Sequence, residues 1–170
     1  MNPVVVSILT RTIAAGTPLL LGTMGEIVTE RSGVLNLGVE GMMSMGAVAA
    51  FMVAMNTGSP WAGLAAAVVA GAALSLLHAF STITLKVNQT VSGLALSMLG
   101  VGMSGLLGKP YMGRPLQSQM PDLRIPVLAD IPYAGKILFD QDPLFYFAIV
   151  LGVVLWFLLA RTRWGLRVRS

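Results

Sequence analysis

The segment WAGLAAAVVAGAALSLLHAFSTITL, residues 61–85, contains no aspartate, glutamate, lysine or arginine. A helix needs about 20 consecutive apolar residues to cross the hydrocarbon core of a bilayer, so this segment is long enough to cross with some tilt. Trp61 opens the segment and Lys86 follows it, which are the positions where such residues anchor a helix at the membrane interfaces. The segment therefore predicts a transmembrane helix.

The composition of the whole chain indicates the same environment. Hydrophobic residues make up 55% of the 170 residues and charged residues only 11%, whereas soluble domains carry roughly a quarter charged residues. So few charges cannot cover the surface of a soluble fold. We therefore expect an all-α, polytopic transmembrane helical bundle with about five spans, at least one of them discontinuous. Besides 61–85, the expected spans are residues 4–24, 42–55, 90–108 and 144–160.

Polar or proline-containing segments punctuate these spans. Pro18 is expected to kink or break the first span, and NTGSP at 56–60 has strong turn chemistry. Residues 109–143 are proline-rich and balanced in charge, which predicts an extracytoplasmic aqueous loop with room for a short surface helix.

The basic run RTRWGLRVRS occupies residues 161–170. Because lysine and arginine concentrate on the cytoplasmic flanks of membrane helices, this run predicts a cytoplasmic carboxyl terminus. Counting back through the spans places Lys86 inside and Asn56 outside, and five full crossings would place the amino terminus outside. The basic residues form no stripe interleaved with aromatic residues, so nucleic-acid binding is not expected.

Small residues recur at four-residue spacing through 90–108. Such a ridge lets another helix approach closely, because no large side chain separates the backbones. The residues expected to pack in this way are Gly93, Ser97, Gly100, Ser104 and Gly108.

The stretch GEIVTERSGVLNLGVEG at 25–41 carries carboxylates between two apolar blocks. Carboxylates at membrane depth are costly and invite a functional interpretation. For Glu26 and Glu30, a short solvated cytoplasmic loop shared with Arg31 is the favoured interpretation. Glu40 admits two interpretations. It either lines a half-broken membrane helix, or it faces the dipole of a helix whose cap is Asn36.

A second polar group, NQTVS at 88–92, lies at the start of a span. Capping of the following helix is favoured over ligand contact for this group. His78 is interpreted as a helix-to-helix hydrogen-bonding residue, because a lone histidine lacks partners for metal or nucleophilic chemistry. The sequence contains no cysteine, one histidine and no recognisable catalytic motif, so neither a catalytic site nor a metal site is expected.

Three stretches together carry a resemblance to a known family: GEIVTERSGVLNLGVEGMM at 25–43, KVNQTVSGLALSMLG at 86–100, and TRWGLRVRS at 162–170. They resemble the permeases of bacterial ATP-binding-cassette (ABC) importers for nucleosides and simple sugars, which are related to branched-chain amino acid permeases. The guanosine-type nucleoside subgroup is the most similar. Family members continue past residue 170, so the resemblance implies a single permease domain over 1–170 that is incomplete at its carboxyl end.

The resemblance implies a multi-pass subunit of the bacterial cytoplasmic (inner) membrane. Its expected partners are a second homologous permease, a cytoplasmic ABC ATPase that binds ATP and Mg, an extracytoplasmic substrate-binding lipoprotein, and the lipid bilayer. No cofactor is expected in this chain.

The resemblance also implies roles for individual residues. Asn36, Glu40 and Gly41 would lie in a break near the substrate path, with Asn88, Gln89 and Ser92 as a second candidate group. Residues 161–170 would begin the cytoplasmic coupling region, with Arg161, Arg163, Trp164, Arg167 and Arg169.

Three other functions remain as alternatives. The solute could be a simple sugar such as ribose, with branched-chain amino acids a more distant third. An ATP-independent channel or secondary carrier would use the carboxylates to bind protons or cations. A structural subunit would only scaffold its partners, and substitutions at Asn36 or Glu40 would then leave transport unchanged.

Overall fold

The computed structural model describes residues 3–116, 120–124 and 134–168. The chain divides into two compact units. One unit comprises residues 29–119, and the other comprises residues 1–28 together with 120–170. Each unit is described separately below.

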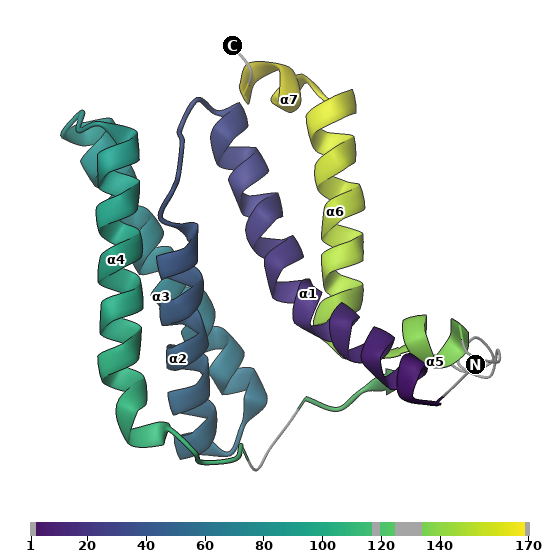
Figure 1. Ribbon diagram of the computed structural model, residues 1–170. Helices are drawn as coiled ribbons and strands as arrows, with labels where there is room; N and C mark the ends of the chain where they lie inside the picture. Colours follow the sequence, from purple (N-terminus) through teal and green to yellow (C-terminus); the bar gives the residue numbers. More distant parts are fainter. Residues whose placement is uncertain (1–2, 117–119, 125–133, 169–170) are drawn as a thin grey trace. The chain divides into compact units, whose positions relative to one another are not determined.

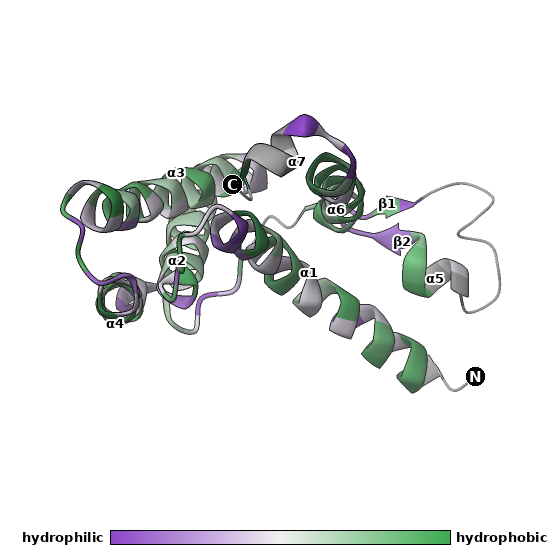
Figure 2. Ribbon diagram, turned by 90° about the horizontal axis from the view of Figure 1, so that it is seen from above, coloured by the Kyte–Doolittle hydropathy of each residue, from purple (hydrophilic) through white to green (hydrophobic). Residues whose placement is uncertain are grey.

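Among the described residues, five helices are long and apolar enough to cross a membrane. They are α1 (Pro3–Arg31), α2 (Val39–Thr57), α3 (Pro60–Ala79) with its continuation η1 (Phe80–Thr84), α4 (Gln89–Gly108) and α6 (Pro143–Arg161) (Figure 1). Their surfaces are mostly hydrophobic, and hydrophilic residues concentrate at helix ends and in connections (Figure 2). The predicted all-α, polytopic class is confirmed.

The unit formed by residues 29–119 is built around α2. This helix packs extensively against both α3 and α4, whereas α3 and α4 touch each other only slightly. Seen from above, α2 lies between α3 and α4 (Figure 2). The two outer helices are therefore held together mainly through α2.

Glycines allow α2 to approach both neighbours at backbone distance. A methyl group added at Gly100 of α4 would lie 2.5 Å from the carbonyl oxygen of Gly41 in α2. On the other side, one added at Gly63 of α3 would lie 2.7 Å from the carbonyl oxygen of Ala50. Contacts this close exclude any side chain at these two positions, so packing of small residues sets the helix spacing.

The connection between α2 and α3 is a tight turn, as NTGSP predicts. Gly58 has a φ of 69°, a left-handed conformation that glycine adopts without steric cost, and its N–H donates to the carbonyl of Ala54 over 2.8 Å. The Ser59 hydroxyl accepts from the N–H of Ala62, and Pro60 occupies the first helical position. The end of one span and the start of the next are therefore locally encoded.

In the other unit, α1 remains helical through Pro18, so the predicted break is wrong. Proline removes one backbone donor, and membrane helices tolerate this loss when neighbouring groups compensate. Directly before Pro18, the buried Thr17 hydroxyl donates to the carbonyl of Ile13 over 3.0 Å. Gly152 of α6 faces the Met24 side chain of α1.

Short elements precede and follow α6. Strand β1 (Leu123–Arg124) pairs antiparallel with β2 (Asp140–Gln141), and helix α5 (Ala134–Leu138) lies between them in sequence. The Asp142 side chain caps α6 by accepting from the N–H of Phe145 over 3.0 Å. Helix α7 (Arg163–Val168) follows α6. The predicted loop at 109–143 therefore contains short regular elements where the structure describes it.

The close approach of α2 and α4 gives the first testable prediction. Gly100→Ala should destabilise the protein by about 1–3 kcal/mol, because the new methyl group would overlap backbone atoms of Gly41 and push the helices apart. The measurement is thermal unfolding in detergent, followed by loss of the monodisperse peak in size-exclusion chromatography.

Gly102→Ala provides the matched control on the same helix. A methyl group at Gly102 would meet no atom within 4 Å, so the better helix propensity of alanine should leave stability unchanged or raise it by up to about 1 kcal/mol. Equal melting temperatures for the two variants would contradict backbone-level packing at Gly100.

Candidate functional site

The linker at residues 32–38, between α1 and α2, is held by one side chain from α4. The Oε1 atom of Gln89 accepts from the N–H of Leu35 over 2.7 Å, and its Nε2 atom donates to the carbonyl of Gly33 over 3.3 Å. The amide of Gln89 thus pairs with the linker backbone as a neighbouring strand would. The linker and the start of α4 consequently lie together.

His78 joins three segments of the same unit. Its side chain is 4% exposed, with Nε2 3.3 Å from the carbonyl oxygen of Leu35 and Nδ1 3.3 Å from the hydroxyl of Ser92. A carbonyl only accepts, so Nε2 carries a proton, and in the neutral ring Nδ1 accepts from the Ser92 hydroxyl. The prediction that His78 hydrogen-bonds between helices is confirmed, and the contact extends to the linker.

An unusual backbone segment follows His78. Residues of η1 (Phe80–Thr84) form a π-helix, in which the N–H of Leu85 donates to the carbonyl of Phe80 over 3.1 Å. The buried Thr82 hydroxyl donates to the carbonyl of His78 over 2.9 Å, and Lys86 has a φ of 54°. Single π-turns occur frequently at functional sites. Hydropathy does not indicate this one, and the only sequence signal is the hydroxyl-rich run after His78.

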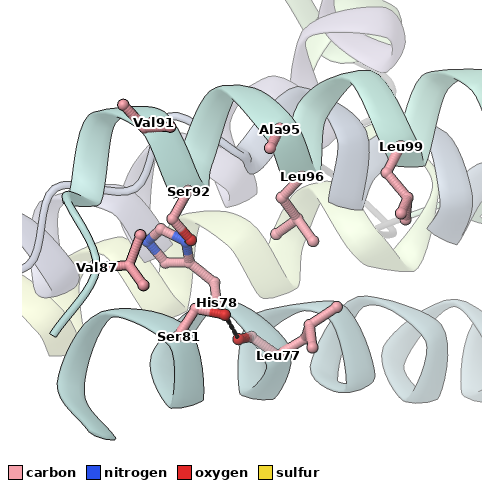
Figure 3. Close-up of a pocket in the computed structure, with 9 residues that line it drawn as sticks. All are labelled: Leu77, His78, Ser81, Val87, Val91, Ser92, Ala95, Leu96 and Leu99. Carbon is pink, nitrogen blue, oxygen red and sulfur yellow. Dashed lines mark hydrogen bonds between the residues drawn. The ribbon is translucent and has the colours of Figure 1, made fainter. Parts of the chain in front are cut away.

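A groove of about 330 Å³ opens between α3 and α4 beside His78 (Figure 3). His78, Ser81 and Ser92 gather at one end, and the side chains of Leu96 and Leu99 extend along α4 away from them. No charged side chain lines it. The lining residues are Leu77, His78, Ser81, Val87, Val91, Ser92, Ala95, Leu96 and Leu99.

Of the first predicted polar group, Asn36, Glu40 and Gly41, only Asn36 lies in an unwound segment. The unwound segment is 32–38, and α2 begins at Val39, so Glu40 and Gly41 lie in the first helical turn rather than in the break. Asn36 is buried, and its Oδ1 accepts from the N–H of Gly38 over 3.0 Å. This bond ends the linker and allows the helix to start, which explains the shift. Gly38 occupies the cap position that was assigned to Asn36.

Of the two interpretations of Glu40, the helix amino terminus agrees with the structure. Glu40 is exposed in the first turn of α2, where a carboxylate is favoured by the helix dipole. Gly41 is buried because it faces the backbone of Ser97 in α4. Neither residue lines the groove.

The second predicted group has divided roles. Asn88 caps α4 by accepting from the N–H of Val91 over 3.2 Å, as the capping interpretation predicted. Gln89 holds the linker and Ser92 faces the groove. In the small-residue ridge, Gly93 approaches the backbone of Leu37, so the ridge contacts the linker as well as α2.

The last two residues of the ridge are Ser104 and Gly108. Ser104 is buried, and its hydroxyl donates to the carbonyl of Val101 over 2.8 Å. Gly108 faces the Val48 side chain of α2.

The basic run at residues 161–170 belongs to the other unit. Arg161 ends α6, Arg163 begins α7, and both are exposed. Trp164 and Arg167 lie within α7, and Arg169 lies outside the described residues. Among the residues that the structure describes, no group of three acidic, histidine or cysteine side chains could hold a metal ion.

Comparison with protein families gives one match over nearly the whole chain. The family model described as "Branched-chain amino acid transport system / permease component" matches residues 8–170. No solved structure matches the chain.

Three curated proteins are similar to the chain. The guanosine ABC transporter permease protein NupQ of Bacillus subtilis is 38% identical over 172 residues, covering 94% of this chain and 53% of NupQ. The nucleoside ABC transporter permease protein NupC of Lactococcus lactis is 32% identical over 164 residues, covering 91% of this chain and 52% of NupC. A Haloferax volcanii protein provisionally named a glucose ABC transporter permease is 38% identical over 165 residues, covering 95% of this chain and 50% of that protein. The chain thus spans about half the length of these relatives.

The contact between Gln89 and the linker can be tested by amide hydrogen exchange. Gln89→Ala should accelerate exchange within residues 32–38 roughly 3- to 10-fold, since each lost hydrogen bond contributes about 0.5–1.5 kcal/mol. Thr90→Ala, which changes a neighbouring exposed residue, is the control. Mass spectrometry on the detergent-solubilised protein would measure the exchange rates of residues 32–38 in both variants. If Gln89→Ala exchanges no faster than the unmodified protein, the assigned contact is contradicted.

Proposed function

The chain belongs to the branched-chain amino acid transport system / permease component family, and on that premise we propose that it is the transmembrane permease subunit of an ABC importer for nucleosides. The observation that carries the proposal is the family match over residues 8–170, joined to similarity with relatives named as guanosine and nucleoside permeases. The helices long enough to cross a membrane agree with a multi-pass membrane protein.

In this function the chain makes and breaks no covalent bond. It forms half of a translocation path with a second, homologous permease and receives solute from an extracytoplasmic binding lipoprotein. ATP hydrolysis occurs in cytoplasmic ATPase subunits, to which the basic region from Arg161 onward leads. The membrane is the bacterial cytoplasmic membrane, with the carboxyl end of α6 inside.

The residues near the path are proposed on two kinds of support. Asn36, Gln89 and Ser92 meet at the junction of the linker, α3 and α4. Glu40, Gly41 and Asn88 act there through helix ends and packing, given their cap and contact positions.

A simple-sugar permease is the second candidate, and the similarity to the Haloferax volcanii protein supports it. A proton- or cation-coupled carrier has less support. The similar proteins are named as ABC permeases, and no carboxylate that could bind a cation lines the groove.

Uptake by the complete transporter tests the proposed function. Cells that express this permease with its partner subunits should accumulate radiolabelled guanosine, and other unlabelled nucleosides should compete more strongly than ribose or glucose. A catalytically inactive variant of the partner ATPase should abolish accumulation. Guanosine uptake that persists with the inactive ATPase would contradict an ABC mechanism, and stronger competition by sugars would assign the sugar alternative.

Orientation can be tested directly because the sequence contains no cysteine. Arg114→Cys, in the exposed segment after α4, should react with a membrane-impermeant maleimide in intact cells. Arg163→Cys, at the exposed start of α7, should react only after permeabilisation. The reverse pattern would place the carboxyl end of α6 outside.

A further inference from the structure

We propose that the groove between α3 and α4 is a solute-binding site for an uncharged, hydroxyl-bearing ligand, with Ser81 and Ser92 as hydrogen-bond acceptors. This inference rests on the proposed transport function and specifies which surface of this chain the solute contacts. It is carried by the hydrogen bonds that surround the groove, by the absence of charge in its lining, and by its size.

The two groove hydroxyls are already committed as donors. In the tautomer that carries its proton on Nε2 and donates to the carbonyl of Leu35, Nδ1 of His78 accepts from the Ser92 hydroxyl. The Ser81 hydroxyl donates to the carbonyl of Leu77 over 2.9 Å. Each serine oxygen therefore has only lone pairs to offer to a ligand. The polar end of the groove selects ligands that donate hydrogen bonds, as a vicinal diol does.

His78 acts as a positioning residue in this arrangement. Its ring is buried and fixed at both nitrogens, which fixes the direction of the Ser92 hydroxyl. Ser81 follows Leu77 by one helical turn and still bonds its carbonyl, so Ser81 faces the same groove as Leu77 and His78 (Figure 3). His78 thus orients the Ser92 hydroxyl, and the carbonyl of Leu77 orients the Ser81 hydroxyl.

The lining also restricts the charge of the ligand. None of the nine lining residues is an aspartate, glutamate, lysine or arginine, and a charged ligand in an apolar groove without a counter-charge is strongly disfavoured. A zwitterionic amino acid or a nucleotide phosphate matches this surface poorly. A neutral sugar or nucleoside matches it.

The walls and the size favour a nucleoside over a free sugar. Aliphatic side chains from α4 and from Val87 line most of the groove and offer a surface for the flat face of a base. The volume of about 330 Å³ lies at the small end of the range of ligand sites, so it fits one small molecule. In this arrangement the ribosyl hydroxyls donate to Ser81 and Ser92.

Protection of an introduced cysteine tests the site without relying on transport. Val91→Cys and, separately, Ala95→Cys place the only cysteine of this chain in the groove, within the complete transporter in membrane vesicles. N-ethylmaleimide should modify each thiol, and guanosine should slow the modification at least about 5-fold. Ser75→Cys, on the exposed face of α3 outside the groove, should show no protection.

Two further comparisons assign the contacts. Ser81→Ala is added to each cysteine variant. It should raise the guanosine concentration that gives half-maximal protection of the thiol roughly 3- to 10-fold. The corresponding concentration of 2′,3′-dideoxyguanosine should be unchanged, because only the diol donates to the serine. Adding Ser75→Ala should change neither. Protection by ribose at concentrations similar to those of guanosine would assign a sugar instead of a nucleoside.

The outcomes separate this site from the proposed function. Guanosine uptake without protection of either cysteine overturns the groove and leaves the importer function standing. Thiols that resist modification in the absence of solute overturn it too, because lipid or another helix then covers the groove. Loss of affinity for both nucleosides in Ser81→Ala contradicts the diol contact. Absence of guanosine uptake by the unmodified transporter contradicts the function itself.

Discussion

Backbone contact between α2 and α4 is the constraint on which the rest of the 29–119 unit depends. Gly41 and Gly100 meet without intervening side chains, and Gly93 meets the linker at Leu37. Only at this spacing can Gln89 reach the linker backbone and His78 reach both Leu35 and Ser92. Since α2 packs closely on both α3 and α4 while these two touch each other only slightly, the groove lies between the two outer helices.

Hydropathy and turn chemistry were sufficient to predict the spans, the Gly58 turn and the cap at Asn88, because each depends on neighbours in sequence. The position of the unwound segment was not predictable, since it depends on which atom Asn36 bonds, and that atom belongs to Gly38. Pro18 was misjudged because membrane helices tolerate proline. The groove was not predictable, because it depends on the packing that brings His78 and Ser81 into one lining with Ser92 of α4.

The distribution of polar groups agrees with the proposed groove for neutral solutes. The carboxylate of Glu40 lies at an exposed helix end, whereas the polar groups of the groove are the His78 ring and the hydroxyls of Ser81 and Ser92. In an apolar environment a hydroxyl whose proton is already bonded has little freedom to reorganise. Selectivity in such a site comes from the direction of a few hydrogen bonds, and mean polarity has little influence on it.

The π-turn after α3 also has a consequence for comparing sequences. A π-turn contains one residue more than the equivalent α-helical turn, and one residue corresponds to about 100° of rotation around a helix. Removing a single residue between Phe80 and Thr84 would restore a regular α-helix and shift the residues that follow it, including Val87 of the groove lining, relative to His78. Among related permeases, a one-residue gap at this position should therefore mark proteins that have exchanged one set of solutes for another.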